Sequence, residues 1–259
     1  MLLTPQPLVS ILMLTYNREQ FLSTAIASVI AQSYTNWELV IIDDGSTDST
    51  SQLVTSFGES RIRYLHHLEN VGLHTRRKES LQYVKGDYVA ILDSDDAWID
   101  TGKIAAQVNF LEEQQECVLV GTFTQLIDNA GATIGESRFY TGDVSIREHI
   151  LLRNQFTHSA VMMRTDALKK TAGYQPTLAE DLELFLQLGT HGTLANLPIV
   201  ATAHRVHENS QNDHGIKMCS AVHHIIKKHS DYPMYKKALA KSYLRVTYCT
   251  LRDMLRKKP

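Results

Sequence analysis

Three carboxylates stand within four residues in the segment Asp93-Ser-Asp95-Asp96. Such a cluster costs electrostatic free energy unless a cation or hydrogen bonds compensate it. Carboxylate oxygens select a hard divalent ion, Mg²⁺ or Mn²⁺, which commonly keeps waters and binds substrate phosphates. The alternative is an acidic turn that caps the following helix. The cluster follows the apolar run from Tyr88 to Leu92, and this position favours a metal site that binds a diphosphate.

A second acidic segment, Asp43-Asp44-Gly45-Ser46, follows the apolar run 37–42. Asp-Gly is typical of turns, and Ser46 or Asp48 can cap the next helix. Asp44 can instead accept hydrogen bonds from a nucleobase or a ribose. Tyr16 follows another apolar run, where it can stack on a base or simply lie at the edge of a loop.

Apolar runs of strand length alternate with amphipathic stretches over the first hundred residues. The expected strands are 9–14, 37–42, 62–65 and 88–92, and the expected helices start near residues 17, 48 and 72. Asn17 and Gln20 resemble a capping box at the first helix. Strands that are apolar on both faces and separated by helices indicate a parallel sheet covered on both sides. Ligands bind outside the carboxyl ends of such strands, so the acidic segments should share one edge.

The pattern changes after about residue 117, where a hairpin is expected with its turn at 128–131. A strand over 159–163, helices over 165–171 and 182–188, and an extended segment over 194–203 follow. We expect an α/β fold with a Rossmann-like, mostly parallel sheet flanked by helices. One catalytic domain would span 1–215, with a nucleotide-binding half (1–100) and an acceptor and base half (101–215). A helical C-terminal tail would span 216–259.

Composition narrows the class of protein. The 259 residues are 43% hydrophobic and carry a formal charge of −2, which suits a soluble globular protein and gives no reason to expect nucleic acid as a partner. Cys117, Cys219 and Cys249 are odd in number and far apart, so neither a disulfide framework nor a zinc site is expected. No stretch reaches the roughly 18 to 20 apolar residues of a membrane span. We therefore expect a cytoplasmic protein.

Several enzyme classes lack their signature motifs. No Walker loop and no GxGxxG follows a strand, so ATPases and dinucleotide-dependent oxidoreductases are not supported. No GxSxG motif supports a hydrolase. A sugar nucleotidyltransferase would need a glycine-rich basic loop after the first strand, where Leu-Thr-Tyr-Asn-Arg stands instead.

Five motifs occur in the order and rough spacing of family-two glycosyltransferases with a GT-A fold, which the chain resembles over about its first 210 residues. They are Ser10-Ile-Leu-Met-Leu-Thr-Tyr-Asn17, Val40-Ile-Ile-Asp-Asp-Gly-Ser-Thr-Asp48, Asn70-Val-Gly72, Gly86-Asp-Tyr-Val-Ala-Ile-Leu-Asp-Ser-Asp-Asp96 and Ala179-Glu-Asp181. The resemblance implies metal-dependent, inverting transfer of a hexose-type sugar from a nucleotide-sugar donor, for which we expect a UDP sugar. The acceptor would be a hydroxyl of a glycan or lipid-linked glycan in surface polysaccharide biosynthesis. A nucleotide-sugar-binding protein without catalysis is the alternative.

The resemblance also implies roles for single residues. Tyr16 and Asp44 would contact the nucleotide base, Asp93 and Asp95 the ribose and the phosphate side. Asp96, with Asp95 beside it, would ligate Mn²⁺ or Mg²⁺. The predicted donor-binding residues are Thr15, Tyr16, Asn17, Asp44, Arg77, Asp93, Asp95, Glu180 and His207.

Glu180-Asp181 matches the Glu-Asp pair of the family, whose aspartate is the general base. An acceptor hydroxyl is a poor nucleophile at neutral pH, so a base must take its proton. Asp181 starts an apolar helix, whose dipole favours the ionised carboxylate. It could instead only cap that helix. His207 lies in a stretch resembling the Arg-x-His of the family and would reach the diphosphate or the metal; the alternative is a surface histidine.

Two local features remain open. The family often has Ala-Arg-Asn where this chain has Arg76-Arg77-Lys78, so Arg77 takes the place of the family's arginine. The added charge can hold phosphates or form a solvated helix face. The C-terminal tail is basic and amphipathic, and it can lie on the inner face of an anionic membrane or pack on the catalytic domain. Its apolar residues are Tyr235, Leu239, Tyr243, Val246, Met254 and Leu255, and its basic residues are Lys236, Lys237, Lys241, Arg245, Arg252, Arg256, Lys257 and Lys258.

Overall fold

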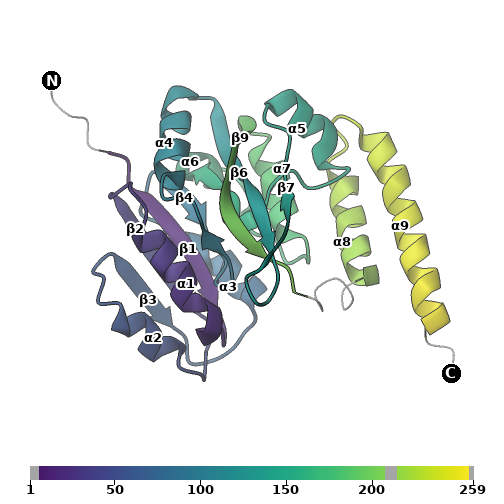
Figure 1. Cartoon of the computed structure of the whole chain (residues 1–259). Coiled ribbons are helices and arrows are strands. Elements are labelled where there is room, and N and C mark those ends of the chain that lie inside the picture. Colours follow the sequence, from purple (N-terminus) through teal and green to yellow (C-terminus); the bar gives the residue numbers. More distant parts are fainter. Residues whose placement is uncertain (1–5, 208–214, 257–259) are drawn as a thin grey trace.

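The structure is a computed structural model that describes residues 6–207 and 215–256, the last four of these by their backbone only (Figure 1). Within these residues, nine strands form one mixed sheet in the order β3-β2-β1-β4-β8-β6-β9-β5, with β7 paired to β6. The strands are β1 Val9–Thr15, β2 Trp37–Asp43, β3 Ile62–His66, β4 Tyr88–Ile91, β5 Ala97–Trp98, β6 Cys117–Ile127, β7 Thr133–Ser137, β8 Met162–Arg164 and β9 Thr193–Arg205.

The first four strands form the parallel half of the sheet, as the alternation of apolar runs and helices predicts. β1 pairs with β2 and β4, and β2 pairs with β3, all in parallel. β8 then runs antiparallel to β4 and to β6. β6 and β9 are parallel again, while β7 closes the expected hairpin with β6. The predicted α/β class with a mostly parallel sheet is therefore confirmed.

Helices cover both faces of the sheet because its central strands are apolar on both faces. Ile11 and Met13 of β1 face one core, while Leu12 and Leu14 face the other. α1 and α4 pack on the first core, and α5, α7, α8 and α9 pack on the second. The helices are α1 Glu19–Ile30, α2 Thr50–Ser56, α3 Leu73–Ser80, α4 Lys103–Glu113, α5 Asp143–Ile150, α6 Thr165–Leu168, α7 Glu180–Leu188, α8 Gly215–Lys228 and α9 Tyr235–Arg256, with 3₁₀ turns η1 Leu81–Tyr83 and η2 His158–Ala160.

The predicted capping box at α1 is wrong. The helix starts at Glu19, and its N-cap residue Arg18 makes no side-chain capping bond. Asn17 has a positive φ of 49° and accepts a hydrogen bond from the Thr47 N–H instead. The cap comes from the next loop, where Asp48 accepts from the N–H groups of both Glu19 and Thr50. The same bonds tie the loop after β1 to the loop after β2.

Other boundaries differ from the predicted ones. The helix expected to start near residue 72 ends at Ser80 and continues as η1, and the helix expected over 165–171 ends at Leu168. The strand expected to begin at Ser159 begins at Met162, because η2 precedes it. α4, α5 and the short β5 were not anticipated from the sequence.

The C-terminal segment forms two helices, and α9 lies on the outside of the molecule beside α8 (Figure 1). Ile225, Ile226 and Ala238 belong to the second core, so these helices pack on the catalytic fold. Tyr235 and Leu239 pack against this core as well, which agrees with the second of the two alternatives for the tail at these positions. No helix in the described ranges 6–207 and 215–256 is long and apolar enough to cross a bilayer.

The helix pair places two of the three cysteines close together. Cys219 of α8 and Cys249 of α9 are far apart in sequence, but their sulfurs lie 3.1 Å apart. Both thiols are free. The antiparallel packing of two helices brings together residues that spacing along the chain separates. The predicted tail residues Met254, Leu255 and Arg256 have no described side chains, and Lys257 and Lys258 lie outside the described residues.

Candidate active site

The acidic segment after β4 lines a cleft of about 520 Å³ at the carboxyl edge of the parallel strands. The end of β9 forms the opposite wall, because β9 runs parallel to β6 and finishes at the same edge. Residues lining the cleft are Leu14, Arg18, Leu73, Arg77, Asp93, Ser94, Asp95, Asp96, Leu126, His204, Arg205, Val206 and His207. Several predicted donor-binding residues are thus brought together in one concave site.

Asp96 lies at the bottom of this region, where three protein groups contact its carboxylate. One carboxylate oxygen lies 2.5 Å from Ser159 Oγ and 3.0 Å from His204 Nδ1, and the other accepts from the Arg205 N–H at 2.8 Å. The side chain is 1% exposed. Burial raises the pKa of the Asp96 carboxyl above its usual range. Asp96 therefore joins the ends of three strands, and its side chain presents almost no surface to a metal ion.

Asp95 offers more surface than Asp96. Its carboxylate is 20% exposed and lies 2.8 Å from His207 Nε2, while Arg18 approaches it at 3.9 Å. The other ring nitrogen of His207 lies 2.8 Å from the Asn129 side chain, which orients the imidazole. Among the described residues, no three histidine, cysteine or acidic side chains converge as metal ligands. Asp95 and His207 form a two-residue site that would need further ligands from a substrate.

Arg77 of α3 connects the two halves of the site. Its guanidinium lies 2.9 Å from Asp93 and 3.1 Å from Glu180. Burial opposes the charge on both Arg77 and Asp93, but their mutual attraction raises the pKa of Arg77 and lowers that of Asp93 well below its usual range. Glu180 also lies 2.6 Å from His74 Nδ1. A chain of partly buried charges thus runs from the end of β4 to the start of α7.

His158, Ser159 and Tyr174 belong to the site but were missed in the sequence. His158 Nδ1 lies 3.2 Å from Asp93 Oδ2, and its Nε2 lies 2.8 Å from the Tyr174 hydroxyl. Ser159 Oγ accepts from the Asp93 N–H and reaches Asp96. β8 is antiparallel to β4, so its starting end meets the carboxyl end of β4. The polar residues His158 and Ser159 come before that strand rather than after it, and this position could have marked them as site residues.

Asp44 is fully buried, with an exposed fraction of 0%. Its oxygens accept hydrogen bonds from the N–H groups of Val71 and Gly72 and from Arg76 Nε. No oxygen of Asp44 is exposed to contact a base directly in this arrangement. Asp44 and Arg76 instead hold the segment before α3, which carries Arg77. Of the three basic residues in α3, only Lys78 is exposed.

The loop after β1 contributes different groups. The Tyr16 side chain is available for contact, since the residue is 38% exposed. The Thr15 hydroxyl is buried and has no hydrogen-bond partner among the described residues. Asn17 forms its hydrogen bonds with the neighbouring loop: its N–H donates to Ser46 Oγ, and its side-chain oxygen accepts from the Thr47 N–H.

Asp181 lies in the first turn of α7, next to the charge chain that ends at Glu180. Its carboxylate is half-buried and accepts a hydrogen bond of 2.9 Å from Asn154 Nδ2. Asn154 precedes the segment that leads into η2, and no motif in the sequence marks it. One oxygen of Asp181 is therefore held by Asn154, while the other accepts no hydrogen bond from the described residues.

Comparison with known proteins identifies the family. The profile described as "Glycosyl transferase family 2" matches residues 10–170. The chain belongs to glycosyltransferase family 2. This glycosyltransferase is 30% identical over 206 residues to the Escherichia coli UDP-Glc:alpha-D-GlcNAc-diphosphoundecaprenol beta-1,3-glucosyltransferase WfaP, and the match covers 78% of this chain and 79% of the relative. The predicted family and enzyme class are therefore confirmed, and a sugar nucleotidyltransferase is set aside.

Solved structures share the GT-A fold of this glycosyltransferase. Residues 1–349 of Staphylococcus aureus TarS in complex with UDP-GlcNAc superpose with a TM-score of 0.73 at 19% identity, covering 92% of this chain and 72% of that one. The mannosyltransferase PcManGT from Pyrobaculum calidifontis, in complex with GDP-Man and Mn²⁺, superposes with a TM-score of 0.69 at 15% identity, covering 99% and 77%. At these identities the likeness concerns the fold.

Proposed function

We propose that this glycosyltransferase moves a sugar from a UDP-sugar donor to a hydroxyl of a lipid-linked glycan in surface polysaccharide biosynthesis, with inversion at the anomeric carbon. The observation that carries this proposal is the chain of partly buried charges from Asp93 through Arg77 to Glu180, beside Asp181. This chain of charges fixes the position of the candidate base, Asp181, relative to the acidic cleft. The E. coli relative is named for UDP-Glc and a diphosphoundecaprenol-linked acceptor, and TarS was solved with UDP-GlcNAc.

The donor would bind along the carboxyl edge of β1 and β4. Tyr16 is exposed enough to stack on the base, whereas the hydroxyl of Thr15 is buried and would contact the nucleotide only if the loop after β1 moved. Asp93 would contact the ribose side. We assign Asp44 an indirect role, because its bonds order the segment before α3 rather than face the cleft. We propose that residues 1–100 bind the nucleotide, that residues 101–215 bind the acceptor and supply the base, and that residues 216–259 form a helical tail.

We assign the metal contact to Asp95 and His207 rather than to Asp96. A carboxylate oxygen and an imidazole nitrogen suit Mn²⁺, and a carboxylate with waters and phosphates suits Mg²⁺. The Asp95 and His207 side chains are 20% and 28% exposed, whereas the Asp96 side chain is 1% exposed. An ion bound by Asp95 and His207 would replace the contact between His207 Nε2 and Asp95 Oδ2. A bound divalent ion would stabilise the negative charge that develops on the leaving diphosphate. Asn129 keeps the His207 ring in orientation for this contact.

Asp181 would take the proton of the acceptor hydroxyl. Single displacement needs one base on the face opposite the leaving diphosphate. The Asn154 side chain fixes the rotamer of the Asp181 carboxylate by bonding one oxygen. The first turn of α7 favours the ionised form through the helix dipole. Arg77 and Glu180 hold the start of the helix against the donor half of the site.

A panel of nucleotide sugars tests the function directly. With Mn²⁺ present and the ligand at about 100 times its Kd, a UDP sugar should stabilise the protein by about 2.7 kcal/mol, which is a rise in Tm of several degrees. GDP sugars and dTDP sugars at the same concentration serve as matched controls. Binding of a UDP sugar with no hydrolysis and no transfer would favour a binding protein without catalysis. The absence of a shift with every donor would contradict the proposal.

We also propose a cytoplasmic protein that contacts the inner face of a membrane through α9. Leu244, Tyr248 and Leu251 recur at helical spacing and are 72%, 66% and 56% exposed. Basic residues on the same helix suit an anionic lipid surface. The protein should float with anionic liposomes, and Leu244→Ser with Leu251→Ser should weaken this binding. Val144→Ser, at a 71% exposed position of α5, is the matched control. Equal flotation of all variants would contradict a role for α9.

A further inference from the structure

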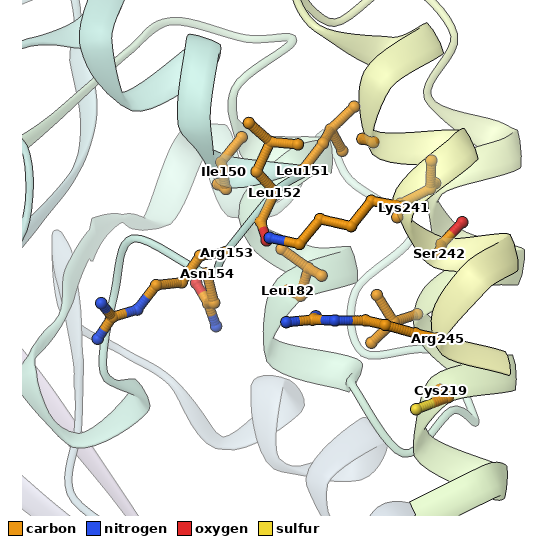
Figure 2. A pocket seen from close by; sticks show the side chains of 13 residues that line it. Ile150, Leu151, Leu152, Arg153, Asn154, Leu182, Cys219, Lys241, Ser242 and Arg245 are labelled. Atoms are coloured by element: carbon orange, nitrogen blue, oxygen red, sulfur yellow. The ribbon is translucent and has the colours of Figure 1, made fainter. Parts of the chain in front are cut away.

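A second pocket, of about 270 Å³, lies between α9 and the segment 150–154 (Figure 2). We call it the α9 pocket. Helices α7 and α8 complete its walls. Its apolar lining includes Ile150, Leu151, Leu152, Leu182, Val222, Ile226 and Ala238. Most of these side chains belong to the second core and are 0–5% exposed, so the apolar area that a hydrocarbon chain could remove from water comes mainly from the partly buried Leu152 and Val222.

Three cations line this pocket: Lys241 and Arg245 reach from α9 across its apolar space, while the Arg153 side chain points away from α9 (Figure 2). Lys241 Nζ lies 3.5 Å from the Leu152 carbonyl oxygen. The ion pairs in the described part of the chain include none of these three side chains, and the three residues are exposed. Like charges gathered around one apolar mouth favour an anion that is attached to an apolar body.

The α9 pocket lies directly beside the candidate base. Asn154 lines the pocket and donates the hydrogen bond that holds Asp181. Leu182, the next residue in α7, lines the pocket as well. A molecule in the pocket would therefore extend from an apolar end, past the cations, toward the carboxylate that would activate a hydroxyl.

We propose that the α9 pocket binds the lipid phosphate or diphosphate end of the acceptor. The first part of the lipid chain would contact the apolar lining, Lys241 and Arg245 would hold the phosphate groups, and the attached sugar would present its hydroxyl to Asp181. This inference rests on the proposed function and narrows it, since a lipid-free glycan would use neither the apolar lining nor the cations.

Isothermal titration of the full chain with farnesyl diphosphate tests the pocket. Wild-type protein should bind it, and the double variant Lys241→Glu, Arg245→Glu should bind about tenfold more weakly or worse, because two charge-assisted contacts become repulsive. Lys236→Glu is the matched control, since this residue is exposed on the same helix but does not line the pocket. Farnesol and inorganic diphosphate should each bind more weakly than farnesyl diphosphate.

Each outcome separates the pocket from its alternatives. Equal affinity of wild type and double variant overturns the inference, as does inorganic diphosphate binding as tightly as the farnesyl compound. Binding to phosphatidylglycerol vesicles without binding of monomeric farnesyl diphosphate also overturns it, in favour of a membrane contact. UDP-sugar binding is measured on the same preparations. If the wild-type protein does not bind a UDP sugar, the proposed function is rejected. If it binds the UDP sugar but binds farnesyl diphosphate no better than the double variant does, only the α9 pocket is rejected.

Discussion

Asp181→Asn is expected to lower kcat by about two to four orders of magnitude, the usual contribution of a general base. The amide has nearly the shape of the carboxylate, and its oxygen can still accept the bond from Asn154 Nδ2. It cannot take a proton from the acceptor hydroxyl. Donor and metal affinity should stay close to wild type, because Asp181 does not line the acidic cleft in which we propose that the donor and the metal bind.

Initial rates of sugar transfer, together with donor affinity by thermal shift, measure these two effects separately. Asp166→Asn is the matched control, because Asp166 is an exposed aspartate in the first turn of another helix, α6. Near-normal turnover of Asp181→Asn would show that the carboxylate only stabilises the start of α7. The anomeric configuration of the product gives an independent result, since retention of the donor's configuration would contradict single displacement.

The parallel half of the sheet could be predicted because each strand carries its own signal. Val9–Thr15 and Trp37–Asp43 are apolar on both faces, and only a strand covered on both sides requires this. The rule for ligand sites in such sheets then located the acidic edge. The same rule failed for His158 and Ser159, which precede an antiparallel strand. A local pattern does not show the direction in which a later strand enters the sheet.

The resemblance assigned the metal to Asp96, but the burial of each carboxylate in Asp93-Ser-Asp95-Asp96 could not be predicted from the sequence. Adjacent aspartates look equivalent along the chain, but β9 brings His204 and the Arg205 N–H onto Asp96 from more than a hundred residues away. Asp44 is a similar case, because its partners include Arg76 of the following helix. In both places long-range hydrogen bonds decide which carboxylate is buried and which faces the cleft.

Removal of divalent metal is expected to lower the rate of transfer by about two orders of magnitude or more, because the leaving diphosphate loses the cation that stabilises its charge. Excess EDTA, with metal loss verified by elemental analysis, should produce this effect, and added Mn²⁺ should restore activity. Full activity of verified metal-free protein would contradict the metal assignment as a whole.

Two neighbouring substitutions then decide which aspartate binds the ion. Asp95→Asn should raise the Mn²⁺ concentration needed for half-maximal donor binding by about tenfold or more, with little change in Tm, because the residue is partly exposed. Asp96→Asn should act mainly on stability, since it disturbs a buried carboxylate that Ser159, His204 and the Arg205 N–H all contact. The opposite pattern, a normal Mn²⁺ requirement in Asp95→Asn and a raised one in Asp96→Asn, would return the role of direct ligand to Asp96. Measuring both the Mn²⁺ dependence and the Tm of the two variants distinguishes the loss of a metal ligand from a loss of stability.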